Sequence, residues 1–597
     1  MRFFLSIFLF FVFNLFSQKN DPLLVNPIDR FNQEKWVDSL YNDMSLDQKI
    51  GQLFMPMVFS KKDSSHYMAT LKLIKKYHIG GIVFSLGSPF KQTKWLNSFQ
   101  KSSKTPLLVA MDAEWGVSMR LDSVIPFPWN MTLGAIRDTS LIRQIGYRMA
   151  LQEKRLGVHL SFSPVLDINI NPNNPIIGNR SFGESKELVS NHSLALMKGH
   201  HDAGILTSGK HFPGHGDTDS DSHKILPFLK FNKNRLNEIE LYPYYKLIKE
   251  DLPSIMIAHL NVPSLTSENI PTSLSRTLIK DVLKEKMNFK GLVITDALNM
   301  EGVYQNSKSK NVDLDAFIAG NDLLIVSRSI PKGFKAIKKS YKRGIISENR
   351  LSHSVKKILK AKYKAGLNNY KPVKLKNVTN DINSQADSFL INKAFSSAIT
   401  LLKNKEKTIP LSLDEKIAHI SLGDAPSKFY RFQLKKKFNI KTLENIDSTN
   451  YKDKIKNYDK IIISFHRSNK TPWKSEKMNK NQLELIKRIS NEKNIVLNLF
   501  VKPYVLKDLV GMDNISSILL SYQNSEFAQK ASVNSLFGFE KISGRLPVSG
   551  SKEYLFNSGM DLLPQDYLSY AEPETLGFDK QKLYKLDSLA KISIDSM

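Results

Sequence analysis

Short apolar runs recur along the first half of the chain, and helical patterns separate them. The runs contain few polar positions, as in strands that are buried on both faces of a parallel sheet. Predicted strands cover residues 53–59, 81–85, 107–112, 158–162, 206–210, 254–259, 292–296 and 322–326, and predicted helices include 63–77, 139–156, 186–203, 232–249 and 275–286. Roughly eight β/α units of this kind predict an α/β domain, a (β/α)8 TIM-type barrel, over residues 30–366.

The pattern changes after residue 366. Residues 367–384 are mostly polar, and we expect them to form a linker. Further strand patterns follow at residues 417–422, 460–465, 495–500 and 518–521, with helical patterns such as 481–489 and 526–536 between them. We therefore expect an α/β sandwich as a second domain over residues 385–560. It has neither a GxGxxG turn after its first strand nor a P-loop, so nothing in the sequence indicates a nucleotide site.

The two ends of the chain have patterns of their own. Arg2 precedes an apolar run from Phe3 to Phe16 and a polar stretch follows, which is the order of a secretory signal peptide. The run is shorter than the roughly twenty residues that span a bilayer. Residues 1–18 thus predict export to the periplasm or the exterior, with an uncleaved membrane anchor as the alternative. Residues 571–597 are an amphipathic segment too short for a core, and we expect them to begin a further domain.

Composition and charge narrow the classes of partner. The chain has no cysteine, which excludes disulfides and cysteine-linked lipid anchors. A net charge of +29 suits nucleic acid, but the lysines and arginines are scattered, and no zinc finger, RNA-binding signature or basic helix accompanies them. We therefore expect no nucleic-acid partner. A solvated cationic surface with weak association to an anionic cell envelope fits the charge better.

Groups that titrate or bind ligands are concentrated in residues 210–223. Aspartates at positions 217, 219 and 221 have the spacing that opens an EF-hand calcium loop, but Ser222 and Phe228 occupy positions where that loop needs Gly and Glu. The histidines match no zinc-binding spacing and no cysteine supports them, so we expect no metal. A polar surface turn and an acid–base site remain as interpretations.

Acid–base chemistry is the sharper interpretation of this segment. Asp221 stands two residues before His223, so an extended or sharply turned backbone can bring both side chains to one site. A carboxylate that accepts a hydrogen bond from one ring nitrogen fixes the histidine tautomer and raises its basicity. The other ring nitrogen can then transfer a proton near neutral pH.

Polar residues also recur at the carboxyl ends of the predicted strands. Asp112, His211, His259 and Asp296 each lie at or just after such an end, and Asp167 follows another. Any one of them could cap a helix. Several at the same end of successive strands indicate a functional site, because barrel enzymes place their sites there.

These segments resemble a known family. The sequence Lys210-His211-Phe212-Pro213-Gly214-His215-Gly216, with residues 217–223, is similar to the signature of β-N-acetylhexosaminidases in glycoside hydrolase family 3. The similarity continues in order at Asp112-Ala113-Glu114, at Asn179-Arg180-Ser181-Phe182-Gly183, and at residues 294–300 and 543–548, and it covers roughly residues 35–560. It implies a retaining glycosidase that removes terminal β-linked N-acetylglucosamine from muropeptides or chitin fragments, without a cofactor.

The resemblance also implies roles for individual residues. Asp296 would be the nucleophile of a retaining mechanism, and His223 the proton donor, with Asp221 orienting it. The residues expected to bind the sugar are Asp112, Arg120, Arg180, Lys210 and His211, with Asp167 as a further candidate. His259 fits a core residue equally well.

The chain departs from the family in two places. Trp115 follows Glu114 where the family often has glycine, so we expect it to reshape the pocket or to stack on a sugar. Residues 573–578 are similar to the opening of a serine β-lactamase-like domain, but the Ser-x-x-Lys nucleophile region of such a domain is missing, and no such activity is implied.

Other functions stay open at this stage. A β-glucosidase or a phosphorylase of the same family is one alternative, because a histidine acid–base avoids a second carboxylate that would repel phosphate. A non-catalytic carbohydrate-binding envelope protein is an alternative of another class. A metal-dependent hydrolase is a third.

Overall fold

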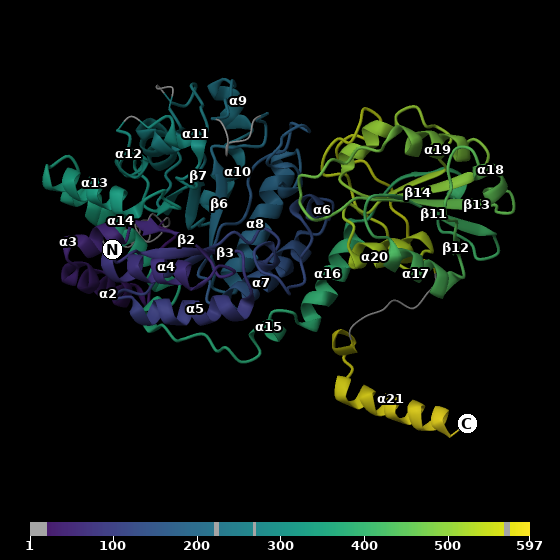
Figure 1. Ribbon diagram of the computed structural model, residues 1–597, viewed down its shortest axis with the longest axis horizontal. Helices are drawn as coiled ribbons and strands as arrows, with labels where there is room; N and C mark the ends of the chain where they lie inside the picture. The colour runs from purple at the N-terminus through teal and green to yellow at the C-terminus, as the bar shows by residue number, and fades with distance from the viewer. Residues whose placement is uncertain (1–20, 220–225, 267–269, 308, 566–572, 597) are drawn as a thin grey trace, which may run out of the picture.

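Two α/β domains lie next to each other, and a C-terminal helix stands apart from both (Figure 1). The computed structural model describes residues 21–219, 226–266, 270–307, 309–565 and 573–596. The predicted signal peptide, residues 1–18, falls outside these ranges, so export stays a prediction. Within the ranges, we find no helix with the length and hydropathy of a membrane span.

A curled parallel sheet of seven strands forms the centre of the first domain. In spatial order the strands are β2 (Met57–Phe59), β3 (Gly81–Ser85), β4 (Leu108–Met111), β5 (Leu160–Ser161), β6 (Leu206–Phe212), β7 (Ser254–Ile257) and β8 (Leu292–Thr295). A separate parallel pair joins β1 (Phe54–Met55) to β9 (Leu324–Ile325). Strands therefore occur at all eight predicted positions.

The prediction of a (β/α)8 barrel is confirmed in part. Seven of the strands share one curled sheet, whereas β9 pairs with β1 outside it. Pro56 separates β1 from β2, and because proline has no backbone N–H, it interrupts the ladder within the predicted strand 53–59. A single bridge between Ile294 and Leu323 lies between β8 and β9.

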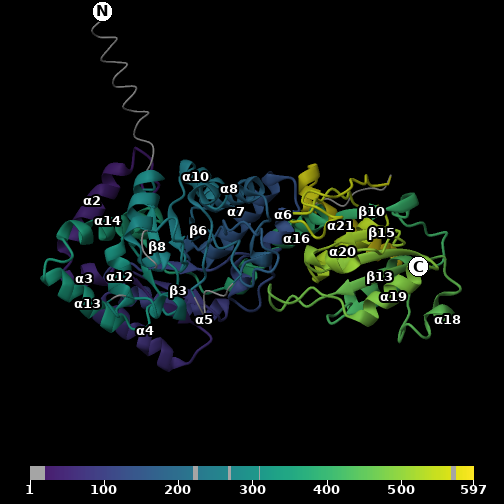
Figure 2. The same cartoon turned by 90° about the horizontal axis from the view of Figure 1, so that it is seen from above.

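Helices surround the sheet of the first domain (Figures 1 and 2). Polar side chains start several of them: Ser88 accepts a hydrogen bond from the N–H of Lys91, and Ser185 does the same for Leu188. The helices are α2 (Arg30–Asp43), α3 (Leu46–Gly51), α4 (Ser64–Tyr77), α5 (Pro89–Ser102), α6 (Asn130–Gly134), α7 (Thr139–Arg155), α8 (Lys186–Asp202), α9 (Lys233–Glu238), α10 (Tyr242–Lys249), the π-helix η4 (Thr277–Lys286), α11 (Glu301–Tyr304), α12 (Val312–Ala319), α13 (Ile330–Lys342) and α14 (Glu348–Lys364).

The second domain is built on a six-stranded sheet. Its order is β10 (Thr400–Asn404), β15 (Ser517–Leu520), β14 (Asn494–Phe500), β13 (Lys460–His466), β11 (Ile417–Gly423) and β12 (Lys441–Thr442), with β10 antiparallel to β15 and the other pairs parallel. The four central strands match the prediction. The edge strands β10 and β12 were not predicted, because β12 has only two residues and β10 ends in the polar residues Lys403 and Asn404. The helices are α16 (Gln385–Ala398), α17 (Lys428–Phe438), α18 (Tyr451–Ile455), α19 (Lys480–Ser490) and α20 (Glu526–Leu536).

The predicted linker runs along the first domain. It contains two short helices, η5 (Leu367–Asn369) and α15 (Val378–Asp381). The guanidinium of Arg155 donates to the carbonyls of Lys374 and Lys376 at 2.7 and 2.8 Å, and it pairs with Asp381 at 2.8 Å. Beyond the second domain, the C-terminal helix α21 (Lys580–Asp595) buries no residue.

Buried and partly buried polar contacts join the two domains. The side-chain carbonyl of Gln523 accepts hydrogen bonds from the N–H of Trp129 at 2.7 Å and from the hydroxyl of Thr132 at 2.8 Å. The carboxylate of Glu184 accepts from both the N–H and the hydroxyl of Ser549, at 2.8 and 2.6 Å. Such contacts hold only at one distance and orientation, so they set how the second domain sits against the first.

Candidate functional site

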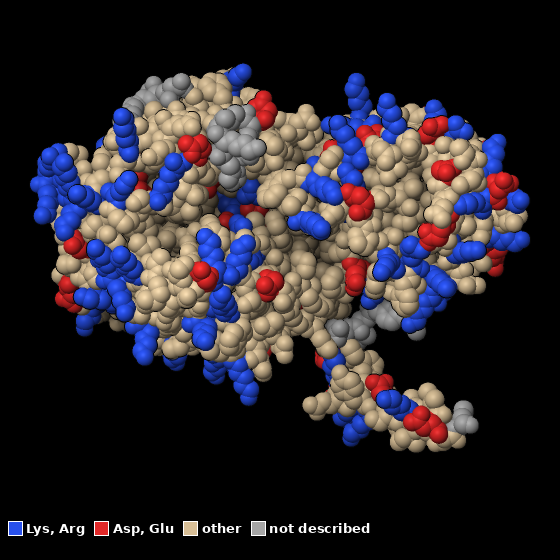
Figure 3. Space-filling model, viewed as in Figure 1, with Lys and Arg blue, Asp and Glu red and all other residues tan. Residues whose placement is uncertain are grey.

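The predicted site residues that the structure describes gather at the carboxyl ends of the strands. Asp112 follows β4, Asp167 follows β5, Lys210 and His211 lie in the last part of β6, and Asp296 follows β8. Figure 3 shows a hollow in this part of the first domain, with both basic and acidic side chains in its floor. The strand-end pattern of the sequence thus brings these side chains to one place.

A chain of alternating charges forms the floor of the site. The Lys210 ammonium lies 2.8 Å from Asp112 and 2.8 Å from Glu114. Arg180 binds Glu114 through two nitrogens, at 2.9 Å from Nε and 2.7 Å from Nη2. Arg120 closes the chain with a 2.7 Å contact to Asp112. Three cations thus hold two carboxylates, and Lys210 is only 1% exposed.

The cations keep both carboxylates ionised. Burial raises the pKa of Glu114, but the charges of Arg180 and Lys210 outweigh it and lower that pKa to about 2. Burial also raises the pKa of Asp112, and Lys210 and Arg120 bring it far below its usual range. Both groups therefore accept hydrogen bonds at neutral pH, as sugar hydroxyls require.

Asp167 anchors the histidine of this site. Its carboxylate lies 2.6 Å from Nδ1 of His211 and accepts the backbone N–H groups of His211 and His215, at 3.2 and 2.7 Å. Nε2 of His211 lies 3.2 Å from Nη2 of Arg180. A guanidinium only donates, so the tautomer that satisfies both contacts has its proton on Nδ1.

Asp296 is held at the edge of the sheet. Its N–H donates to the carbonyl of Ile257 at 2.9 Å, and its carboxylate accepts the N–H of Ala297 at 2.7 Å. Burial raises its pKa, but His211 and His259 lower it. The Ala297 N–H and Lys210 add to that lowering, so the pKa lies below its usual range. An ionised, half-buried carboxylate suits a nucleophile.

His259 braces the segment that follows Asp296. Its ring is buried, with Nδ1 2.7 Å from the hydroxyl of Ser273 and Nε2 3.1 Å from the carbonyl of Ala297. The sequence alone left open whether His259 belongs to the core or to the site. The structure places it in the core and in contact with the residue after Asp296.

Sequence reasoning assigned no role to Glu114, which carries two of the ion pairs of the site. A usable signal was present, because Glu114 stands two residues after Asp112 in the same segment that resembles the family. Trp115, expected to reshape the pocket or to stack on a sugar, is buried, and its ring centroid lies 6.1 Å from that of Trp129.

Asp221 and His223 lie outside the described residues. The chain is fixed on both sides of them: Arg235 pairs with Asp217 at 3.2 Å, and Phe228 forms a bridge with Asn261. Their convergence on Asp296 stays a prediction. Among the described residues, no group of three or more His, Asp or Glu side chains is arranged to hold a metal ion.

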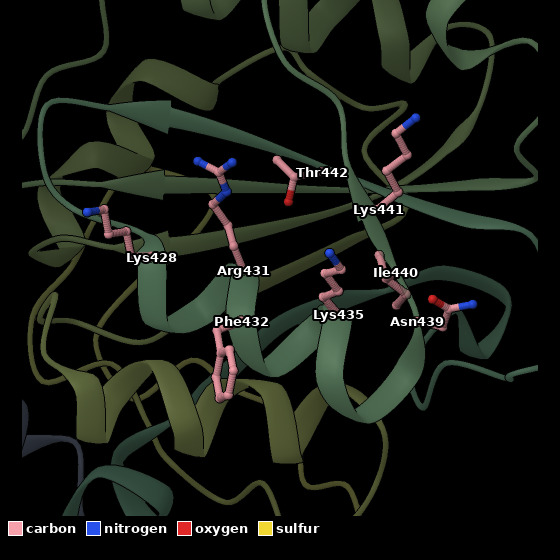
Figure 4. Close-up of a pocket in the computed structure, with 8 residues that line it drawn as sticks. All are labelled: Lys428, Arg431, Phe432, Lys435, Asn439, Ile440, Lys441 and Thr442. Carbon is pink, nitrogen blue, oxygen red and sulfur yellow. The ribbon is translucent and has the colours of Figure 1, made fainter.

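A second pocket lies on the second domain. It has a volume of about 640 Å³ and lies between α17 and the turn into β12 (Figure 4). Its lining includes Lys428, Arg431, Lys435 and Lys441 and no carboxylate. It offers cations for an anionic ligand but no nucleophile for a glycosidase.

Comparison with known proteins places the chain in a family. The glycosyl hydrolase family 3 N-terminal domain matches residues 45–361, and the C-terminal domain of that family matches residues 399–590. This chain belongs to glycosyl hydrolase family 3. The predicted family and the prediction of a glycosidase are thereby confirmed. The second match extends into the tail, whose similarity to a β-lactamase-like domain stays a prediction.

Relatives and solved structures agree with this placement. The chain is 28% identical over 395 residues to beta-hexosaminidase A of Pseudoalteromonas piscicida, covering 60% of this chain and 65% of that protein. It is 34% identical over 259 residues to a beta-hexosaminidase of Neisseria meningitidis, covering 42% and 71%. The structure of a family 3 beta-N-acetylglucosaminidase from Paenibacillus sp. is similar, with a TM-score of 0.71, 26% identity, and coverage of 85% of this chain and 99% of that one.

The paired charges predict how stability depends on pH. Glu114 has an ordinary pKa of 4.5 and a folded pKa of about 2, so its contribution is complete above about pH 4.5 and disappears as the pH falls towards 2. We expect Glu114→Gln to lower the free energy of unfolding at pH 7, and the difference from the wild type to shrink by about 2 kcal/mol between pH 7 and pH 3. Urea unfolding at pH 7, 4 and 3 measures it.

The exposed pair of Glu484 and Arg488 supplies the control. Glu484→Gln should change the free energy of unfolding by less than about 1 kcal/mol at each pH. A Glu114→Gln difference of the same size at pH 7 and pH 3 would contradict the lowered pKa.

Proposed function

We propose that the chain is a retaining β-N-acetylhexosaminidase that removes terminal β-linked N-acetylglucosamine from muropeptides or chito-oligosaccharides. One observation carries the proposal: Asp296 keeps a lowered pKa despite its burial, because His211, His259 and Lys210 lie near it. It follows β8 at the same end of the sheet as the charge network around Lys210, which suits sugar hydroxyls. The names of the beta-hexosaminidase relatives support the choice of sugar.

The proposed reaction has two steps. The Asp296 carboxylate attacks the anomeric carbon, and the bond to the leaving oxygen breaks as that oxygen takes a proton from His223, oriented by Asp221. The covalent glycosyl-enzyme then reacts with water, which gives its proton back to His223, and Asp296 is released. A histidine donor needs no apolar pocket to titrate near neutral pH, whereas a carboxylic acid does.

The charge network would hold the sugar. Asp112 accepts from hydroxyl groups because its negative charge is maintained, and Arg120 restrains its second oxygen at 2.7 Å. Lys210 and Arg180 supply N–H donors for hydroxyls or for the N-acetyl carbonyl. His211 is fixed by Asp167, so its ring keeps one orientation beside Arg180.

A β-glucosidase and a phosphorylase are the alternatives within the family, and the cations of the site would also suit phosphate. Comparing the products formed with and without inorganic phosphate separates hydrolysis from phosphorolysis. A non-catalytic carbohydrate-binding protein is the alternative of another class, and hydrolysis of a glycoside would exclude it.

We further propose export and weak association with an anionic cell envelope. The apolar run at the N-terminus favours export. The basic pocket of the second domain favours the association, since Lys428, Lys435 and Lys441 line it without a carboxylate.

The first test of the proposed function concerns turnover. An aryl N-acetyl-β-glucosaminide should be hydrolysed by the wild type, whereas the corresponding β-glucoside should react more slowly. Asp296→Ala should lose turnover because no nucleophile remains, and azide should restore it by attacking the anomeric carbon from the vacated face. Release of the phenol measures each rate.

Asp202→Ala, which removes an exposed carboxylate paired with Arg143, is the control and should keep wild-type turnover. Near-normal rates for Asp296→Ala would remove Asp296 from its role. A folded wild type that hydrolyses none of the glucosaminides would reject the activity.

A second prediction concerns the proton donor. His223→Ala should slow glycosides with poor leaving groups by about 10²–10⁴-fold, since their oxygen needs a proton to depart. Glycosides with good leaving groups should keep a fast first step and show a burst of phenol. Pre-steady-state measurement of both kinds decides the matter, and equal losses on both would contradict acid catalysis by His223.

A third prediction concerns the envelope. Binding to vesicles of anionic phospholipid should be weak and should fall with salt, because the attraction is screened over about 10 Å at 0.1 M. The triple variant Lys428→Gln, Lys435→Gln, Lys441→Gln should bind less than a variant with Lys72, Lys75 and Lys76 of α4 changed in the same way. Equal sedimentation of the two variants with the vesicles would count against the pocket.

A further inference from the structure

Asp167 and Arg180 lie on one long connection, residues 162–185, between β5 and α8. Apart from the short helix η2 (Gly178–Arg180), this connection has no regular structure of its own. Irregular segments of such length keep one shape only when other contacts restrain them. The restraints on this connection come in part from the second domain.

The first restraint passes through Asn169. Its side-chain carbonyl accepts the N–H of Gly178 at 3.1 Å, and its backbone N–H donates to Gly183 at 2.9 Å, so it ties the connection together around Arg180. Its side-chain N–H donates to the hydroxyl of Tyr504 at 2.5 Å. Asn169 and Tyr504 are both buried, so water does not easily replace this bond when it is lost.

The second restraint comes from the loop between β13 and α19, which reaches from the second domain to the first (Figure 2). Its Trp473 donates Nε1–H to the carbonyl of Ile176 at 2.8 Å, and its Pro472 carbonyl accepts from Asn179 at 2.9 Å. The Ile176 carbonyl also lies 3.4 Å from Nη1 of Arg180. Trp473 therefore holds an atom that the Arg180 guanidinium itself contacts.

We propose that Tyr504 and Trp473 of the second domain are positioning residues for the sugar-binding network of the first. They fix the backbone on both sides of Arg180, and Arg180 in turn fixes Glu114 through two hydrogen bonds. A bidentate guanidinium–carboxylate pair tolerates little displacement. The inference rests on the proposed function in one respect: it takes the affinity for the sugar substrate as the property that these residues affect.

Tyr504→Phe tests the proposal, because it removes one oxygen and keeps the ring. Arg180 would bind the sugar equally in the ground state and the transition state, so its displacement raises KM and leaves kcat almost unchanged. We expect KM to rise about five- to tenfold, with kcat within about twofold of the wild type. Trp473→Phe removes the indole N–H donor together with part of the ring. It should also raise KM.

Tyr430→Phe is the matched control. Tyr430 is buried in the second domain, and its hydroxyl accepts a hydrogen bond from the side-chain N–H of Asn498 at 3.1 Å, as that of Tyr504 does from Asn169. This contact lies wholly within the second domain. A general loss of stability would affect both variants, whereas displacement of Arg180 would affect only Tyr504→Phe.

Amide hydrogen exchange over residues 169–184 supplies a readout that needs no turnover. Exchange in this segment should be faster in Tyr504→Phe than in Tyr430→Phe. The proposal is overturned if either the exchange rate or KM in Tyr504→Phe matches that of the control. If the wild type hydrolyses no glycoside, the proposed function fails on its own, and exchange alone decides whether the second domain restrains this segment.

Discussion

The pairing of Lys210 with two carboxylates is the constraint on which the site depends. Burying an ammonium group that is only 1% exposed is costly unless opposite charges replace the water it has lost. Asp112 and Glu114, both 2.8 Å away, supply those charges. Because Glu114 also binds Arg180 and Asp112 also binds Arg120, a shift of either carboxylate leaves an arginine without its carboxylate partner. A network held by so many ion pairs needs little further ordering to bind a sugar in the way that we propose.

The same constraint explains how the two domains are related. The carboxyl ends of β4, β5, β6 and β8 supply most of the side chains of the site. The connection that carries Arg180 is irregular, and hydrogen bonds from Tyr504 and Trp473 help to restrain it. Among the described residues, Asp296 is held by Ile257 and Ala297 of the first domain, and the basic pocket of the second domain lies between α17 and β12. The relation that we propose between the second domain and the site thus runs through backbone position and not through a reacting group.

Much of the fold was predictable because buried parallel strands are recognisable as continuous apolar runs in the sequence. The apolar runs gave all eight strand positions of the first domain and the four central strands of the second. The edge strands β10 and β12 were missed, since a strand at the edge of a sheet buries only part of its surface. The closed ring was not reproduced as one sheet, because Pro56 separates β1 from β2 and only one bridge joins β8 to β9.

The sequence by itself determined which residue types stand at the strand ends, and the order of motifs that identifies glycosyl hydrolase family 3. Periodicity and short motifs are local, so they can be recognised in one dimension. The tertiary structure decided which charges pair, since Glu114 meets Arg180 across 66 positions and Asp112 meets Lys210 across 98. It also decided that His259 braces Ala297 and that Tyr504 holds Asn169. Such contacts depend on how separate strands and domains pack, and no local pattern records that.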